Sequence, residues 1–333
     1  MNKRVAILGA QNPQELREMA KRILEDAGLE ADILEFPTRN LNDFKLQLAG
    51  YVAIITCGEA VPGEAIRFLS SRGLRLISRC GVGTDEMDHK AAVECGVAIC
   101  NAAGALSTTV AECAMGLMLN VLRQFPAADA DVRRGDWSRF FESKYSNQLE
   151  GKTVGLIGFG DIAKALAKML YGFDCHVLAY DIHFDKQVAD RYGVVEADIK
   201  TIQQESDVIS LHVPAVCGTI GMINKTFLSG MKKTAVLINT GRGKLVVESD
   251  LVEALQNGII AGAGLDVFEY EPLSVDSPLI SMKNVMLLPH YASCTLEALI
   301  RTNRQSAENV VAFMCRKAVS TILNPEYIHN VRD

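Results

Sequence analysis

Residues 154–170 read V-G-L-I-G-F-G-D-I-A-K-A-L-A-K-M-L, and this stretch decides the fold. Its first apolar run predicts a buried strand. The glycines after it predict a tight turn, and the apolar residues that follow at helical spacing predict a helix. The stretch lies near the middle of a chain of 333 residues, so an extensive segment precedes it.

The turn contains the pattern G-x-G-x-x-A, from Gly158 to Ala163. Gly158 permits the tight turn, Gly160 lets the backbone approach a pyrophosphate, and Ala163 allows close packing of helix and strand. Any glycine-rich turn before a helix meets this pattern, but here a strand pattern precedes it. We therefore expect a dinucleotide at the helix N-terminus, where Asp161 and Ile162 supply backbone N–H groups.

A second predicted strand, C-H-V-L-A-Y, ends in Asp181, which lies 21 positions after Gly160. An acidic residue at this spacing binds the adenosine ribose hydroxyls. The next residues, Ile182 and His183, provide no arginine for a 2′-phosphate, so the sequence predicts NAD rather than NADP. The alternative for Asp181 is a helix cap or turn residue.

The composition excludes several classes of protein. The net charge of −6 argues against nucleic acid as a partner. No apolar run is long enough to cross a membrane, and the N-terminal one is too short for a signal peptide. The nine cysteines are scattered without a C-x-x-C motif, which predicts reduced thiols in a cytoplasmic protein rather than disulfides or a metal site.

Apolar runs alternate with helical patterns, first over residues 4–100 and again from 153 to 288. Such alternation predicts parallel sheets covered by helices on both faces. The expected strands are 4–8, 31–36, 51–56, 74–78, 97–100, 153–157, 175–180, 207–213, 235–239, 261–267 and 284–288. The clearest helices are expected at 13–27, 62–72, 88–95, 108–124, 161–171, 248–257 and 295–317.

Three stretches pass from an apolar strand directly into polar side chains: 237–246, 264–273 and 287–295. They contain Arg242, Glu271 and His290. Open α/β sheets bind ligands at the carboxyl ends of their strands, so these residues are expected around one crevice. Each stretch alone is compatible with a solvated loop. Together, a cation, an acid and a histidine suit proton transfer beside a bound nicotinamide.

The chain resembles the D-isomer-specific 2-hydroxyacid dehydrogenases over nearly its whole length. The motifs that carry the resemblance are S-R-C-G-V-G-T-D-E-M-D (78–88), N-A-A-G-A-L-S-T-T-V-A-E (101–112), V-G-L-I-G-F-G-D-I-A (154–163), L-H-V-P (211–214), N-T-G-R-G (239–243), L-D-V-F-E-Y-E-P (265–272) and P-H-Y-A-S (289–293).

The resemblance implies a role for each site residue. Arg242 would bind the substrate carboxylate and 2-oxo group, His290 would exchange a proton with the carbonyl oxygen, and Glu271 would keep His290 protonated. Further implied contacts are the substrate carboxylate with the backbone N–H groups of Val82 and Gly83, the nicotinamide carboxamide with Asp266, and the cofactor with Val82, Val213 and Thr240.

The resemblance also implies an architecture of two doubly wound domains. A flavodoxin-like substrate domain would comprise 1–102 and 291–333, and a Rossmann NAD-binding domain, 103–290, would be inserted into it. The two crossings would form a hinge. A homodimer is implied, with the helix from Thr108 and the segment around Trp137 at its interface; the alternative is a helix that packs within its own molecule.

Two departures bear on the substrate, which the family pattern leaves as a small 2-hydroxy or 2-oxo acid. Glu86 stands where the family usually has asparagine. The loop 56–61 contains Glu59 and no cation, whereas phosphoglycerate dehydrogenases commonly carry basic residues there. The acid would repel a phosphorylated substrate, so 3-phosphoglycerate is not expected.

Two alternatives share the scaffold. One is a phosphite-type dehydrogenase, which oxidises an inorganic hydride donor. The other is a binding protein related to NAD-sensing co-repressors, in which residues of catalytic type persist while the protein recognises partner peptides.

Overall fold

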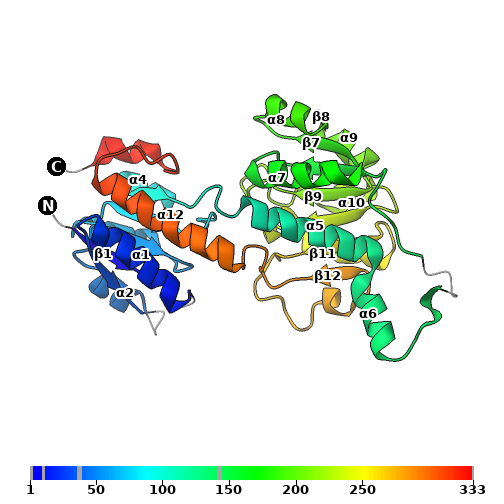
Figure 1. Cartoon of the computed structure of the whole chain (residues 1–333), viewed down its shortest axis with the longest axis horizontal. Helices are drawn as coiled ribbons and strands as arrows, with labels where there is room; N and C mark the ends of the chain where they lie inside the picture. The colour runs from blue at the N-terminus through cyan, green and yellow to red at the C-terminus, as the bar shows by residue number, and fades with distance from the viewer. Residues whose placement is uncertain (1–2, 10–11, 36–39, 141–144, 332–333) are drawn as a thin grey trace. The chain divides into compact units, whose positions relative to one another are not determined.

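The computed structural model describes residues 3–9, 12–35, 40–140 and 145–331. The chain forms two compact units, drawn in Figure 1. Unit 1 contains residues 1–106 and 294–333, and unit 2 contains residues 107–293. The chain thus leaves unit 1 after Leu106 and returns at Cys294, a few residues beyond the predicted crossings. No helix in the described ranges is long and apolar enough to cross a membrane.

Unit 1 is built on a five-stranded parallel sheet in the order β2-β1-β3-β4-β5, the flavodoxin-like order. This confirms the predicted fold class. The strands are β1 (Arg4–Ile7), β2 (Glu30–Ile33), β3 (Ala53–Thr56), β4 (Leu76–Arg79) and β5 (Ala98–Cys100). The last residue of the predicted strand 31–36 lies outside the described residues.

Helices cover both faces of this sheet and close a separate core on each. Ala20 of α1 and Val310 of α12 belong to one core, and Phe44 of α2, Ile66 of α3 and Ala91 of α4 belong to the other. The helices are α1 (Gln14–Asp26), α2 (Leu41–Gln47), α3 (Gly63–Ser70), α4 (His89–Glu94) and α12 (Leu296–Met314). The last helix therefore completes the unit that the first strand begins.

Unit 2 is built on a seven-stranded parallel sheet in the order β12-β11-β10-β9-β6-β7-β8. The order reverses beside β6, as in the Rossmann fold. The strands are β6 (Thr153–Ile157), β7 (His176–Tyr180), β8 (Val194–Glu196), β9 (Val208–Leu211), β10 (Val236–Asn239), β11 (Gly262–Leu265) and β12 (Val285–Leu287). The sequence did not predict β8, which has three residues at the sheet edge.

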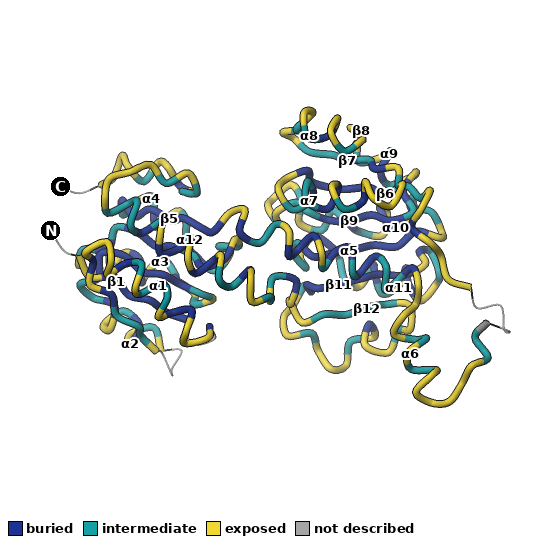
Figure 2. The backbone as a smooth tube through the Cα atoms, in the orientation of Figure 1, coloured by how far each residue is buried: buried dark blue, intermediate teal, exposed yellow. Residues whose placement is uncertain are grey.

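Both faces of this sheet are also covered, and Figure 2 shows its central strands as buried and the edge strand β12 as intermediate. On one face lie α5 (Ser107–Arg123), α7 (Asp161–Leu170) and α8 (Lys186–Arg191), and on the other α9 (Ile199–Glu205), α10 (Lys225–Ser229) and α11 (Glu248–Gln256). One further helix, α6 (Phe125–Arg133), has no buried residue. It starts after Gln124, whose left-handed φ of 54° ends α5 and changes the direction of the chain.

Candidate functional site

Three neighbouring strands of unit 2 deliver the predicted polar residues to one edge of the sheet. Strands β10, β11 and β12 are parallel and adjacent. Arg242 follows β10, Asp266 and Glu271 follow β11, and His290 follows β12. Because carboxyl ends of parallel strands share an edge, the fold gathers these residues at the ligand-binding end of the unit.

His290 and Glu271 form a direct pair. His290 Nδ1 lies 2.7 Å from Glu271 Oε2, and the two side chains are 53% and 35% exposed. The other carboxylate oxygen of Glu271 accepts the N–H of Phe268 at 3.0 Å, which fixes the carboxylate. The pair orients the ring through Nδ1, and the opposite nitrogen, Nε2, is not part of this contact.

Asp266 holds the main chain around His290. The His290 N–H donates to the carbonyl oxygen of Asp266 at 2.8 Å. The two carboxylate oxygens accept the N–H groups of Tyr291 at 2.6 Å and Ala292 at 3.0 Å. Burial, the largest effect, raises the pKa of Asp266. The expected contact with a nicotinamide carboxamide would have to share a carboxylate already engaged within the chain.

His290 itself has a φ of 56°, in the left-handed region that side chains rarely occupy. Such a conformation persists where the surrounding structure enforces it, and it is common at functional sites. The three N–H groups held by Asp266 supply that restraint. The sequence showed the acid but not this role, because nothing in the spacing reveals a left-handed residue.

The loop of Arg242 is shaped by two neighbours that the sequence analysis did not single out. Buried Asn239 donates from Nδ2 to the Arg242 carbonyl oxygen at 2.9 Å and accepts the Gly241 N–H at 3.1 Å. At Gly243, a Cβ would lie 1.7 Å from the Phe268 carbonyl oxygen. The N-T-G-R-G loop therefore packs backbone to backbone against the loop that contains Glu271.

The fingerprint glycines differ from each other in their surroundings. Gly158 has a φ of 97°, and a Cβ there would meet the His212 backbone at 2.7 Å and the Val213 nitrogen at 2.9 Å. Gly160 is exposed, and a Cβ there would meet nothing within 4 Å. The first glycine is thus required by the fold, and the second leaves open space at the start of α7.

That open space fits the pyrophosphate of a dinucleotide. Gly160 is the N-cap of α7 and makes no side-chain capping bond, so the first helical N–H groups, including those of Asp161 and Ile162, face outward from the helix end. The Asp161 side chain is exposed in the first turn, where its negative charge interacts favourably with the positive end of the helix dipole.

Asp181 lies beside the fingerprint turn, as its spacing predicts. Its Oδ2 accepts the Phe159 N–H at 2.6 Å, and its Oδ1 accepts the His183 N–H at 2.8 Å. Each carboxylate oxygen has a second lone pair, so the group can still accept ribose hydroxyls. Thr240, after β10, has a buried Oγ1 without a partner among the described residues.

In unit 1, Val82 and Gly83 lie in the loop after β4. Their carbonyl oxygens accept Asn101 Nδ2 at 2.8 Å and Arg79 Nε at 3.1 Å. Among the described residues, no hydrogen bond uses the N–H of either residue. The loop therefore presents two backbone donors, which suits a carboxylate.

The two acids that depart from the family pattern also lie in unit 1. Glu86 forms an ion pair with Arg79 at 3.1 Å, with side-chain exposures of 26% and 17%. Glu59 accepts the Cys57 N–H at 2.7 Å, so it folds back on its own loop.

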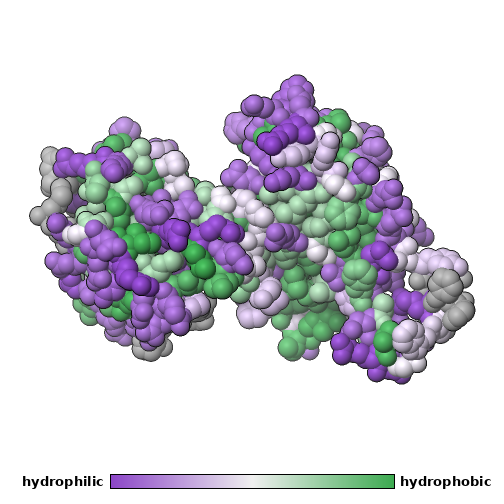
Figure 3. Space-filling model, viewed as in Figure 1, coloured by the Kyte–Doolittle hydropathy of each residue, from purple (hydrophilic) through white to green (hydrophobic). Residues whose placement is uncertain are grey.

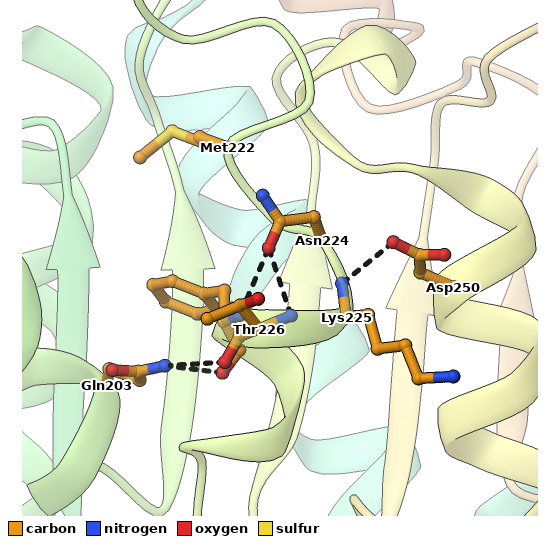
Figure 4. Close-up of a pocket in the computed structure, with 7 residues that line it drawn as sticks. Gln203, Met222, Asn224, Lys225, Thr226 and Asp250 are labelled. Atoms are coloured by element: carbon orange, nitrogen blue, oxygen red, sulfur yellow. Dashed lines mark hydrogen bonds between the residues drawn. The ribbon is translucent and has the colours of Figure 1, made fainter.

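A separate hollow in unit 2 lies beside α10 (Figure 4). Asn224 caps the helix by accepting the N–H groups of Thr226 and Phe227, Asp250 accepts the Lys225 N–H, and Gln203 donates to two carbonyl oxygens. These polar groups satisfy the helix ends, so we do not assign a ligand to this hollow. Within the described ranges, no cluster of His, Cys, Asp and Glu could hold a metal ion.

Comparison with known proteins identifies the family. The model of the D-isomer specific 2-hydroxyacid dehydrogenase NAD binding domain matches residues 115–292. The chain belongs to the D-isomer specific 2-hydroxyacid dehydrogenases. The match covers the fingerprint, Asp181, Arg242, Glu271 and His290.

Individual relatives of this dehydrogenase family extend the match to both units. The chain is 40% identical to a glyoxylate reductase of Thermofilum pendens over 77% of its own length and 76% of the relative's. It is 36% identical to a D-3-phosphoglycerate dehydrogenase of Archaeoglobus fulgidus over 89% of its length, but this covers only 55% of that longer protein.

A solved structure of an NADPH-dependent glyoxylate/hydroxypyruvate reductase from Sinorhizobium meliloti, in complex with NADP and malonate, superimposes with a TM-score of 0.85. It is 29% identical, and the alignment covers 100% of both chains. The family uses a nicotinamide cofactor, and this neighbour shows that the choice between NAD and NADP differs within the fold.

Proposed function

We propose that this protein is an NAD-dependent oxidoreductase that interconverts a small D-2-hydroxy acid and its 2-oxo acid. The observation that carries the proposal is the 2.7 Å contact between His290 and Glu271 at the same sheet edge as Arg242. A cation for a carboxylate and a supported imidazole for a carbonyl oxygen are the two groups that this reaction requires.

Each residue has one task in reduction. Arg242 binds the carboxylate, with Val82 and Gly83 donating backbone N–H groups to it. His290 delivers its proton from Nε2 to the carbonyl oxygen. Glu271 stabilises the imidazolium before this transfer and, after it, the neutral ring with its proton on Nδ1. When bound, a nicotinamide cofactor supplies the hydride that reduces the carbonyl carbon. In oxidation, His290 takes the hydroxyl proton instead.

We propose NAD rather than NADP because of Asp181. Its carboxylate is fixed by the N–H groups of Phe159 and His183, and it would repel a 2′-phosphate. The test compares NADH with NADPH in the wild type, Asp181→Ser and an exposed control, Asp190→Asn. We expect Asp181→Ser to lower the preference for NADH at least about tenfold, which corresponds to 1.4 kcal/mol of binding. An unchanged preference would contradict the assignment.

The substrate is proposed to lack a phosphate group. The Arg79 charge is already paired with Glu86, and Glu59 adds a negative charge to the neighbouring loop. A second anionic group on the substrate would therefore meet no unpaired cation from these two loops. Glyoxylate, hydroxypyruvate and pyruvate fit this description better than phosphohydroxypyruvate.

The central experiment measures NADH oxidation with these four acids and with larger branched or aromatic 2-oxo acids. Arg242→Ala and His290→Ala should each reduce kcat/KM at least about a hundredfold, given the usual effect of losing an oriented charge or a general acid. Lys244→Ala, which removes an exposed positive charge, and His176→Ala, which removes an exposed histidine, are the controls.

The same assay tests the alternatives. NADH formation from phosphite, without turnover of any organic acid, would support a phosphite-type dehydrogenase and overturn the proposal. Absence of turnover together with NAD(H)-dependent binding of a partner protein would support a co-repressor-like function. Near-normal turnover by either alanine variant would contradict the assigned roles.

We further propose a homodimer in the cytoplasm. Apolar residues gather over the part of unit 2 where α5 runs (Figure 3), and Phe125, Val132 and Trp137 nearby in sequence are 47–73% exposed. Exposed apolar surface of this kind is typical of an interface. All nine cysteines are free thiols, which suits a reducing compartment. Light scattering of the wild type and Trp137→Asp would test the dimer.

A further inference from the structure

Two cysteines lie opposite each other at the ligand-binding edge of unit 1. Cys57 directly follows β3 and Cys80 directly follows β4. These strands are parallel neighbours with Thr56 opposite Arg79, so the next positions bring Cys57 opposite Cys80. The Cys80 N–H donates to the Thr56 carbonyl oxygen at 2.7 Å, which continues the pairing beyond the strands.

This spacing suits a disulfide. Neighbouring strands lie about 4.8 Å apart, and disulfide-linked residues have Cα atoms about 4.4–6.8 Å apart. Interaction between the two thiols is the largest cause that lowers the pKa of Cys80 and raises the pKa of Cys57. The interaction therefore favours a thiolate on Cys80 and disfavours a thiolate on Cys57.

The surroundings support Cys80 as the more acidic thiol. Asn12 Nδ2 lies 3.8 Å from Cys80 Sγ and is held by Asn303 Oδ1 at 3.3 Å. The hydroxyl of Thr302 and the charge of Arg79 also stabilise a Cys80 thiolate. Cys80 is 7% exposed, whereas Cys57 is half-buried, so a small oxidant approaches the pair from the Cys57 side.

The fold makes room for this arrangement. Gly9, after β1, has a φ of 105°, and a Cβ there would lie 2.6 Å from Cys57 Cβ. Strand order reverses between β1 and β3, so Cys57 lies at the topological switch point, where open α/β sheets bind ligands. Cys80 begins the loop that contains Val82 and Gly83.

We propose that Cys57 and Cys80 are a redox modification site at which hydrogen peroxide forms a disulfide that inhibits the enzyme. The Cys80 thiolate attacks one peroxide oxygen and breaks the O–O bond, giving a sulfenic acid and, after protonation, water. The Cys57 thiol then attacks Cys80 Sγ and forms the S–S bond, and the S–O bond of the sulfenic acid breaks; the thiol proton and the leaving hydroxide combine as the second water. Two thiols are oxidised by two electrons, and one peroxide is reduced to two waters.

Inhibition follows from the place of Cys80 in the chain, and this part rests on the proposed function. Forming the bond pulls the two sulfurs to about 2.05 Å and draws Cys80 towards the β3 loop. The Val82 and Gly83 donors, two and three residues further on, would be displaced with it. Since a misplacement of about 1 Å can cost about a hundredfold in rate, we expect at least about a tenfold loss in kcat/KM.

The experiment treats the full chain with hydrogen peroxide and maps its peptides by mass spectrometry without reduction. To avoid side reactions, the exposed cysteines Cys217, Cys294 and Cys315 are replaced by serine in every variant. We expect a cross-linked peptide pair containing Cys57 and Cys80, and parallel loss of activity that dithiothreitol reverses. Cys57→Ser should leave a sulfenic acid on Cys80 that dimedone traps, and Cys57→Ala repeats this test if the serine variant folds poorly.

The outcomes separate this proposal from the proposed function. The cross-linked peptides are detected whether or not a substrate is known. If these peptides are absent while peroxide oxidises other residues, the proposed modification site is wrong. Their presence without any change in the kinetics of an active enzyme would overturn its inhibitory effect.

Discussion

The backbone of His290 is held in a left-handed conformation by Asp266, whose carbonyl oxygen accepts the His290 N–H at 2.8 Å. The carboxylate of Asp266 then holds the next two N–H groups of the chain. The proposed acid of the reaction is therefore oriented twice, by Glu271 through its ring and by Asp266 through its backbone.

Replacing Asp266 with asparagine should impair His290 without removing it. The amide keeps one acceptor but presents an NH₂ group to the second N–H, so the turn at Tyr291 and Ala292 loosens. We expect kcat to fall about tenfold to a hundredfold while the NADH dissociation constant changes little. A large loss of NADH affinity at normal kcat would instead support a carboxamide contact. Asp276→Asn, an exposed residue of the following loop, is the control.

The two fingerprint glycines should respond differently to alanine. Gly158→Ala forces a side chain into the left-handed region against the His212 backbone, which should lower the free energy of unfolding by about 1–3 kcal/mol. Gly160→Ala meets no protein atom, so its stability should stay within about 0.5 kcal/mol of the wild type.

Binding should separate the same two variants. In Gly160→Ala the added methyl group occupies the space proposed for the pyrophosphate, so the dissociation constant for NADH should rise at least about tenfold. Urea unfolding measures the free energy of unfolding, and fluorescence titration measures the dissociation constant for NADH. Normal NADH affinity in a folded Gly160→Ala protein would count against a dinucleotide at this turn.

Gly243→Ala should damage both the stability and the site. The added Cβ would lie 1.7 Å from the Phe268 carbonyl oxygen, and only a shift of main chain relieves that overlap. We expect a loss of about 1–3 kcal/mol in the free energy of unfolding and at least about a hundredfold in kcat/KM, because the Arg242 and Glu271 loops move apart. Gly218→Ala, where a Cβ meets nothing within 4 Å, should leave both quantities nearly unchanged.

Stability should fall in mild acid because of His212. Burial lowers its pKa from 6.5 to about 4, and its Nε2 has no partner among the described residues. The unfolded state therefore binds more protons between these values, and the free energy of unfolding decreases as the pH falls from about 6.5 towards 4. The full effect of this one group is up to about 3 kcal/mol.

Urea unfolding at intervals from pH 7 to 4.5 measures the slope. His212→Leu, which cannot bind a proton, should show a shallower pH dependence than the wild type. If both proteins lose stability in parallel, other groups govern the acid response.

The sequence by itself determined the class of the fold and predicted the residues of the candidate site. Strands of parallel sheets are buried on both faces, so their apolar runs stand out, and strand β6 with its glycine turn is recognisable from local spacing alone. Arg242, Glu271 and His290 were identified because each follows such a strand. The sequence did not predict the short elements β8 and α2, and it gave no bounds for the helices α8, α9 and α10 between the later strands, because so few residues give only a weak periodic pattern.

Tertiary structure decided how these residues are held. Asp266 binds three N–H groups of the chain around His290, and these bonds hold His290 in its left-handed conformation. Gly243 packs against Phe268. Both contacts join segments that are distant in sequence. The same is true of Cys57 and Cys80, which lie 23 positions apart and meet only because β3 and β4 are neighbours. Local spacing reveals which residues reach the sheet edge, but only the strand order and the packing of the loops determine which of them touch.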